Sequence, residues 1–174
     1  MVKYLLILIF LFFNDTVNSK DELEIKANQF TYDKDNTRIY ATGDVEIIDE
    51  KFRLNAQKVF LNNETNVLSA REEVEIFDSD GSILKAKKIV ADQELKNAII
   101  EDNFLFIPSQ PFNNKKHYLR LAAKKVERRD EYWEQLESGV FTACEICFNK
   151  KKNKFDDPLI QLRAKKIVHN KKSM

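Results

Sequence analysis

Five short segments of the chain share one pattern of apolar and polar positions. In each, an apolar residue lies two positions before an alanine, two polar residues follow the alanine, and another apolar residue comes next. The anchoring alanines are Ala27, Ala56, Ala86, Ala123 and Ala164. The apolar positions on the two sides of each alanine are out of phase for a straight strand, which predicts a bulge or corner where the strand bends.

A second kind of apolar segment recurs between these alanines. Val45, Val74 and Phe104 each lie 18 residues after their alanine, and Val140 lies 17 residues after Ala123. Around these positions apolar and polar residues alternate, which is the period of a half-buried strand. We expect no helices. The pattern predicts an all-β fold, an elongated antiparallel β-jelly roll or open sandwich built from strand repeats of about 30 residues.

Polar clusters between the apolar segments predict the turns. They lie at residues 33–36, 62–66 and 78–82 and are rich in Asp, Asn and Ser. These short side chains hydrogen-bond to their own backbone and tolerate left-handed angles, so they form turns without many glycines.

The N-terminal residues 1–19 have the features of a secretory signal peptide. Lys3 supplies a positive charge, an apolar run extends from Tyr4 to Phe13, and the segment ends at the small residue Ser19. The run is too short to span a bilayer, which needs about 20 residues. We expect a soluble exported protein with a β-jelly-roll domain over residues 20–148. Residues 149–174 would then hold a basic loop, the final repeat strand and a C-terminal tail.

Charge and composition narrow the function. The 174 residues include 29 Lys and Arg against 28 Asp and Glu, a formal net charge of +1, which argues against a nucleic-acid-binding protein. No phosphate-binding, nucleophile or metalloprotease motif is present. The two cysteines, Cys144 and Cys147, and the two histidines, His117 and His169, do not have the spacing of a structural zinc site. We therefore expect no catalytic residues, no metal and no cofactor.

Four stretches of the repeats carry a resemblance to a known family: residues 27–33, 40–47, 138–147 and 157–169. They resemble the OstA-like (organic solvent tolerance) N-terminal periplasmic domain of the LPS-assembly protein LptD, in the LptA/LptC-like domain superfamily. The resemblance covers about residues 22–170. It implies a periplasmic domain that passes lipopolysaccharide toward the outer membrane, with acyl chains held in an apolar groove. Its implied partners are lipopolysaccharide, other OstA-like Lpt proteins that pair through edge strands, and an outer-membrane barrel component.

The resemblance also bears on the ends of the chain and on its cysteines. Only five residues follow His169, so we expect a free-standing domain or a truncated LptD without a barrel. In the family, cysteines at this junction form disulfides with cysteines of the barrel, which makes Cys144 and Cys147 disulfide candidates. The residues alone leave three alternatives open: the two cysteines bond to each other, bond to another chain or stay reduced.

The inward apolar positions of the strands are the candidate lipid-binding residues. From the residues alone, these positions would simply fill a dry core. The resemblance implies instead that they line a groove that holds lipid. The candidates are Ile25, Phe30, Tyr32, Val45, Ile47, Leu54, Val59, Val74, Ile76, Leu84, Ile89, Phe104, Phe106, Leu121 and Val126.

Two other functions are also consistent with the sequence. Within the same fold, the protein would be a free-standing LptA-like bridge in which the cysteines are incidental. In a different class, it would be a structural or assembly factor with a sealed core and a disulfide to another chain. Positive charge near the C-terminus, at residues 150–154, 163–166 and 171–172, would attract anionic lipid phosphates or form a solvated loop and tail.

Overall fold

The structure is a computed structural model. It describes residues 23–112, 115–143, 148–149, 154–155, 158 and 160–170, with the side chains of 109–112, 115–117, 148–149, 154–155 and 169 left aside. The described residues form strands and turns, as expected, and no helix that is long and apolar enough to cross a membrane occurs among them. The strands are β1 (Glu24–Lys26), β2 (Gln29–Tyr32), β3 (Arg38–Ile48), β4 (Phe52–Asn62), β5 (Val67–Asp78), β6 (Ile83–Asp92), β7 (Ala98–Phe112), β8 (Lys115–Arg129), β9 (Trp133–Thr142), β10 (Phe148–Asn149), β11 (Lys154–Phe155) and β12 (Leu162–Asn170).

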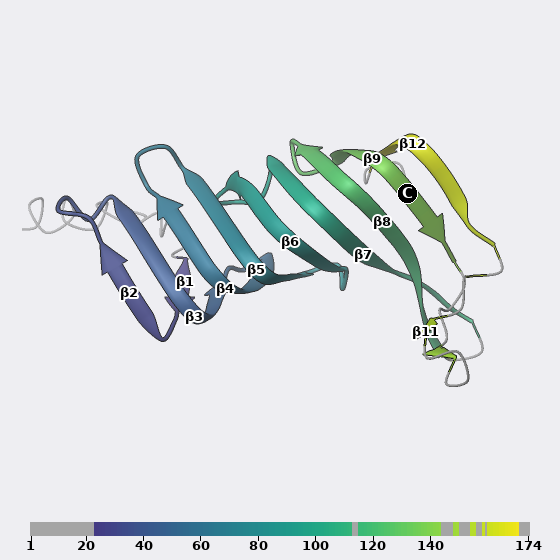
Figure 1. The fold of residues 1–174 in the computed structure, drawn as a ribbon, viewed down its shortest axis with the longest axis horizontal. Coiled ribbons are helices and arrows are strands. Elements are labelled where there is room, and N and C mark those ends of the chain that lie inside the picture. The colour runs from purple at the N-terminus through teal and green to yellow at the C-terminus, as the bar shows by residue number, and fades with distance from the viewer. Residues whose placement is uncertain are drawn as a thin grey trace, which may run out of the picture.

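Ten of these strands form one antiparallel sheet. Its order is β1-β3-β4-β5-β6-β7-β8-β9-β12, with β2 paired to β3 beside β1, and β10 and β11 form a separate hairpin. Consecutive strands therefore follow one another along the long axis of the molecule (Figure 1). The predicted all-β open architecture is confirmed.

The long strands bend at the predicted corners. At each corner the buried positions change phase: Ala56 is followed by Val59, and Ala123 by Val126, all less than a tenth exposed. The register between neighbouring strands also shifts there, as between Thr42 and Val45 of β3. Asp44 has a positive φ at this point, so the corner is a bulge with left-handed residues.

The corners divide the sheet into two arms whose inner faces cover each other. One buried cluster contains residues from both arms, and the described chain has no helix or second large sheet that could cover either face. Arm A comprises strand segments 38–42, 58–62, 67–71, 88–92, 98–101, 125–129, 133–137 and 166–170. Arm B comprises segments 45–48, 52–56, 74–78, 83–86, 103–108, 118–123, 139–142 and 162–164.

The predicted polar turns close the hairpins at the arm ends. Asp33 accepts hydrogen bonds from the Thr37 amide at 2.8 Å, the Thr37 hydroxyl at 2.9 Å and the Arg38 amide at 3.1 Å. These donors, the Arg38 amide first, hold the pKa of Asp33 below its usual value, with burial opposing them. The β4–β5 turn is held in the same way by Asn62, whose side-chain oxygen accepts from the amides of Glu64 and Thr65.

Candidate functional site: the apolar interior of the folded sheet

The interior between the arms is apolar along most of the strand stack. Its largest fully buried apolar side chains are Ile47, Leu54, Leu68, Ile89, Ile100 and Leu136, each no more than 1% exposed. They come from six of the long strands, β3 to β7 and β9, and from both arms. The repeat therefore builds a continuous apolar interior that runs perpendicular to the strands.

Most of the candidate lipid-binding residues lie in this interior. Ten are buried: Val45, Ile47, Leu54, Val59, Val74, Ile76, Leu84, Ile89, Leu121 and Val126. Ile25 and Phe30 are partly buried and pack against the same cluster. Tyr32 lies on the inner side of β2, where its ring stacks on Phe30 at 6.1 Å, but it is 52% exposed because β2 is an edge strand.

Phe104 and Phe106 do not point inward, so this part of the sequence prediction is wrong. Phe104 is 58% exposed and pairs across the sheet with Lys85 and Ala122, whereas the next residue, Leu105, is buried. The reason lies at the corner, where β3 and β5 contain one more residue than β7. The residue of β7 equivalent to Val45 and Val74 is therefore Asn103, which pairs with Ala123 as Val45 pairs with Ala56.

The same change of phase affects β9. Gly139 is buried and pairs with Ala164, whereas Val140 faces outward with Ala122 as its register partner. A Cβ at Gly139 would lie 2.5 Å from Cδ1 of Ile167, so the absence of a side chain leaves room for the Ile167 side chain to pack against β9. The fixed spacing from the anchoring alanine thus identifies the strand in every repeat but not its inner face.

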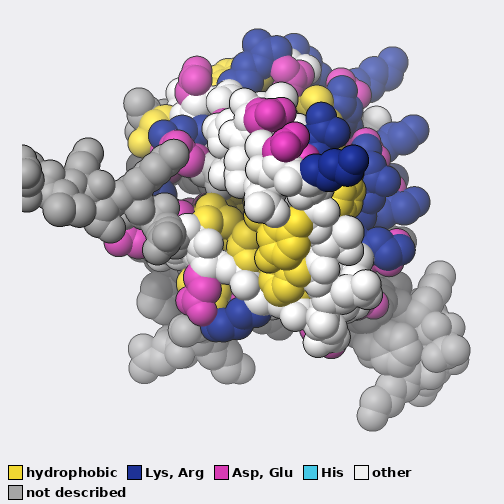
Figure 2. Space-filling model, turned by 90° about the vertical axis from the view of Figure 1, so that its left-hand side faces the viewer, with side chains coloured by type: hydrophobic (Ala, Val, Ile, Leu, Met, Phe, Trp, Pro, Cys, Tyr) yellow, Lys and Arg dark blue, Asp and Glu magenta, His cyan; other side chains and the backbone are white. Residues whose placement is uncertain are grey.

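Among the described residues, the interior is open at the N-terminal end of the stack. Apolar side chains gather in the middle of the molecule in the end-on view, framed by polar and charged ones (Figure 2). The partly buried residues of the core at the first strands are Leu23, Ile25, Ala27, Phe30 and Ile39. No strand of the described residues covers β1 and β2 on their outer side. The end of the apolar interior is thus accessible to a ligand or to another strand.

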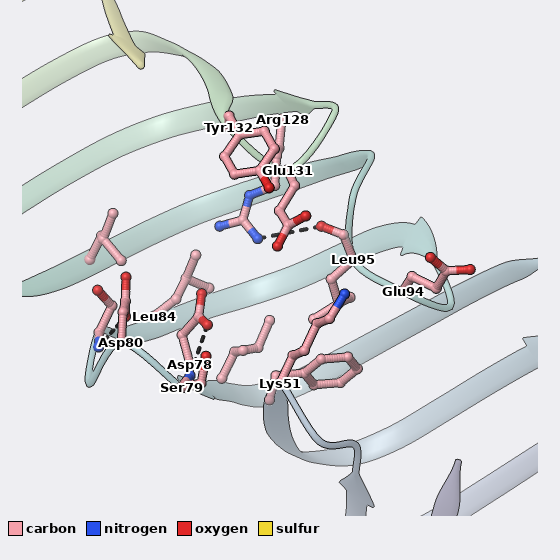
Figure 3. A pocket seen from close by; sticks show the side chains of 14 residues that line it. Lys51, Asp78, Ser79, Asp80, Leu84, Glu94, Leu95, Arg128, Glu131 and Tyr132 are labelled. Atoms are coloured by element: carbon pink, nitrogen blue, oxygen red, sulfur yellow. Dashed lines mark hydrogen bonds between the residues drawn. The ribbon is translucent and has the colours of Figure 1, made fainter. Parts of the chain in front are cut away.

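A second opening lies between the ends of the two arms. This mouth is a pocket of about 270 Å³ lined by 14 residues. Its floor is apolar, formed by Phe52, Ile76, Leu84, Leu95 and Leu105. Figure 3 shows Arg128 of β8 with Glu131 and Tyr132 of the β8–β9 turn on one side, and Asp78, Ser79 and Asp80 at the β5–β6 hairpin on the other. The mouth therefore joins an apolar interior to a charged rim, an arrangement suited to an amphiphile.

A buried ion pair, which was not among the residues singled out from the sequence, borders the mouth. Arg128 donates to Oε1 of Glu134 from Nε at 2.9 Å and from Nη2 at 2.8 Å, and their side chains are 8% and 2% exposed. Nη1 of Arg128 also reaches the carbonyl oxygen of Leu95 at 3.5 Å (Figure 3). Both residues continue the inward alternation, two positions after Val126 and two before Leu136, so the phase could have located them.

Two charged pairs on exposed hairpin ends have perturbed pKa values. Glu94 hydrogen-bonds to Lys96 and raises the pKa of that lysine. Arg129 donates to Glu127 at 2.8 Å and lowers the pKa of that carboxyl. All four groups lie near the hairpin ends of arm A. They form exposed ion pairs, of the kind that contributes little to stability.

Several candidate residues lie outside what the structure describes. Cys144 and Cys147 belong to this group, as do residues 150–153 and 171–174 of the basic C-terminal region. Arg163, Lys165 and Lys166 are described and are exposed on β12. Among the described residues, no group of three or more His, Cys, Asp and Glu side chains is arranged to hold a metal ion.

Comparison with known proteins places the chain in a family. Residues 24–154 match the family described as LptA/(LptD N-terminal domain) LPS transport protein. The chain belongs to this family. Its resemblance to lipopolysaccharide transport domains, drawn from the strand repeats, is thereby confirmed, and the family is one of transport proteins.

The fold also matches a solved structure. The crystal structure of LptH, the LptA homologous periplasmic component of the lipopolysaccharide transport device from Pseudomonas aeruginosa, aligns with a TM-score of 0.51 and 10% identity. The match covers 78% of this chain and 93% of LptH. At this identity the likeness concerns the fold. No curated protein matches the chain.

Proposed function

We propose that the chain is a periplasmic lipopolysaccharide-transfer domain that delivers lipopolysaccharide toward the outer membrane through the apolar interior of its folded sheet. The observation that carries the proposal is the continuous apolar interior, open at the N-terminal end and at the mouth. The transfer of an acyl chain from water into such an interior is favourable by about 0.8 kcal/mol of free energy for each CH2 group. Sugar and phosphate groups would stay outside, at the charged rim.

The degree of packing limits where an acyl chain enters. The central side chains are already fully buried, with Leu54 and Ile100 at 0% exposure. The half-buried Phe30 at the open end and the floor of the mouth offer more accessible contacts. A lipid would therefore enter at these openings and move inward by exchanging one apolar contact for another of similar strength. The energy for net transport would come from other components, since such exchange is nearly neutral.

Neighbouring residues on opposite faces give a sharp test. A photo-crosslinking residue is placed in cells at Phe30 and at Leu105, and separately at the adjacent Thr31 and Phe104, and lipopolysaccharide adducts are measured. We expect adducts at Phe30 and Leu105 and none at the controls. Absence of adducts at the inner positions of a folded, exported protein, or equal labelling on both faces, would refute the lipid pathway.

The finer part of the proposal concerns the setting of the domain, which is the larger protein or assembly in which it works. The leading setting is the N-terminal part of LptD, free-standing or truncated, exported through residues 1–19 and associated with an outer-membrane barrel. The alternative is a free-standing LptA-like bridge that pairs through its edge strands with other Lpt domains. In a third setting, a structural partner would be joined by a disulfide from Cys144 or Cys147. Non-reducing electrophoresis of the native protein tests for a covalent partner: a band that collapses on reduction is expected for a disulfide to a barrel or to a structural partner, and no such band is expected for the bridge.

A further inference from the structure

Charged side chains at the strand corners alternate in sign from one strand to the next. We call this series the corner ladder. The acidic members lie on β3, β5, β7 and β9 and are Asp44, Glu72, Glu73, Glu101, Asp102 and Glu137. The basic members lie on β4, β6, β8 and β12 and are Lys58, Lys87, Lys88, Lys124, Lys125, Lys165 and Lys166. Arg71, just before Glu72, is the exception: it is basic and is the register partner of both Lys58 and Lys88.

Two ion pairs join members of the ladder directly. Lys58 Nζ lies 2.7 Å from Oε1 of Glu72, and Lys88 Nζ lies 3.2 Å from Oε1 of Glu101. Farther along the sheet, Lys125 is the register partner of both Glu101 and Glu137. Opposite charges directly across a strand pair are favourable and like charges are unfavourable. Each basic corner inside the sheet therefore has an acidic corner on both sides.

The series ends at β12 with only one neighbour. Lys166 pairs with Glu137 of β9, and no described strand lies on the other side of β12. Part of the inner face of β12 is also uncovered: Leu162 is 63% exposed, whereas Leu54 and Leu121, its equivalents in interior strands, are 0% and 6% exposed, and only Ile167 of β12 packs partly buried against the core. The last strand thus has the apolar pattern of an interior strand and a basic corner that lacks its second acidic neighbour.

We infer that β12 accepts an edge strand of a different polypeptide whose corner carries acidic residues. The inference rests on the proposed pairing of edge strands and specifies the chemistry of the partner. A second copy fits less well in either arrangement. Its N-terminal edge presents Asn28 and Gln29 at the corner, which carry no charge, and a β12–β12 pair would oppose lysines to lysines.

A binding experiment with strand peptides tests the charge rule on the full chain. The first labelled peptide has the sequence of β5, residues 67–78, and the second carries the changes Glu72→Lys and Glu73→Lys. We expect fluorescence anisotropy at low salt to show that the acidic peptide binds about tenfold more tightly, because two acidic side chains at the corner become basic in the second peptide. In about 1 M salt, where the Debye length is about 3 Å, the preference should largely disappear.

Variants of the protein locate the effect. The double substitution K165E/K166E should reverse the preference toward the lysine peptide. The control K87E/K124E changes the net charge equally at exposed interior lysines and should keep the preference for the acidic peptide. Equal binding of the two peptides, or no reversal by K165E/K166E, would overturn the charge rule while leaving edge pairing intact. If neither peptide bound, edge pairing at β12 would fail too, and lipopolysaccharide crosslinking would still decide the lipid pathway separately.

Discussion

Replacing Asn103 by valine should make the protein more stable. Asn103 is 2% exposed at an inner corner position where β3 and β5 have valines, and its Oδ1 is buried without a hydrogen-bond partner. A buried acceptor left unsatisfied costs about 1–3 kcal/mol. Val45 and Val74, each 1% exposed, show that the corner geometry accepts a β-branched side chain. We therefore expect Asn103→Val to raise the free energy of unfolding by about 2 kcal/mol.

Urea unfolding followed by circular dichroism measures this change. With a slope of about 2 kcal/mol per molar urea, the midpoint should rise by about 1 M at an unchanged slope. Asn103→Ala is the control, since it removes the amide but adds no packing, and its stability should lie between those of the other two proteins. A lower midpoint for Asn103→Val, at the same slope, would show that the amide stabilises the fold, and the reasoning would be refuted.

Three further perturbations follow from the contacts in the sheet. Glu134→Leu should lower the free energy of unfolding by about 3–5 kcal/mol because it leaves Arg128 buried without its partner, and adding Arg128→Met should recover most of the loss in urea titrations. Gly139→Ala should cost about 1–3 kcal/mol through its clash with Ile167, and Ile167→Val, which removes the clashing methyl group, should reduce that cost in a double-mutant cycle; additive effects would contradict the clash. The lowered pKa of Asp33 means that its stabilising contribution is complete above the unfolded-state value of about 4 and is lost as the pH falls through the folded-state value. The difference in thermal midpoint between wild type and Asp33→Ala should therefore shrink below about pH 4, and a constant difference would exclude a role for the carboxylate charge.

The unpaired edges also affect how the protein behaves in solution. β12 is an exposed edge strand with Leu162 and Val168 more than half exposed, and such edges are prone to pair with other chains. The basic corner of β12 restricts which strands it accepts under the charge rule inferred above. The same lysines that would attract an acidic partner would thus disfavour pairing between two copies at this edge.

The sequence alone determined the architecture and its repeat. The alternation of apolar and polar residues identified the strands, the phase change after each anchoring alanine located the corners, and the Asp- and Asn-rich clusters marked the turns. These features are local, because strand periodicity, bulges and turns depend on residues only a few positions apart. The family resemblance follows from the same repeats.

Tertiary structure alone decided which side chains face the interior in the later strands, and which strands remain uncovered. One residue fewer at the corner of β7 moves Phe104 to the outer face and Asn103 and Leu105 to the inner one. The side-chain period of a strand is two, so a single residue gained or lost at a bulge exchanges the faces of everything that follows it. Burial likewise depends on neighbours distant in the sequence: Leu54 and Leu162 occupy the same place in the repeat, but only Leu54 has a strand on both sides.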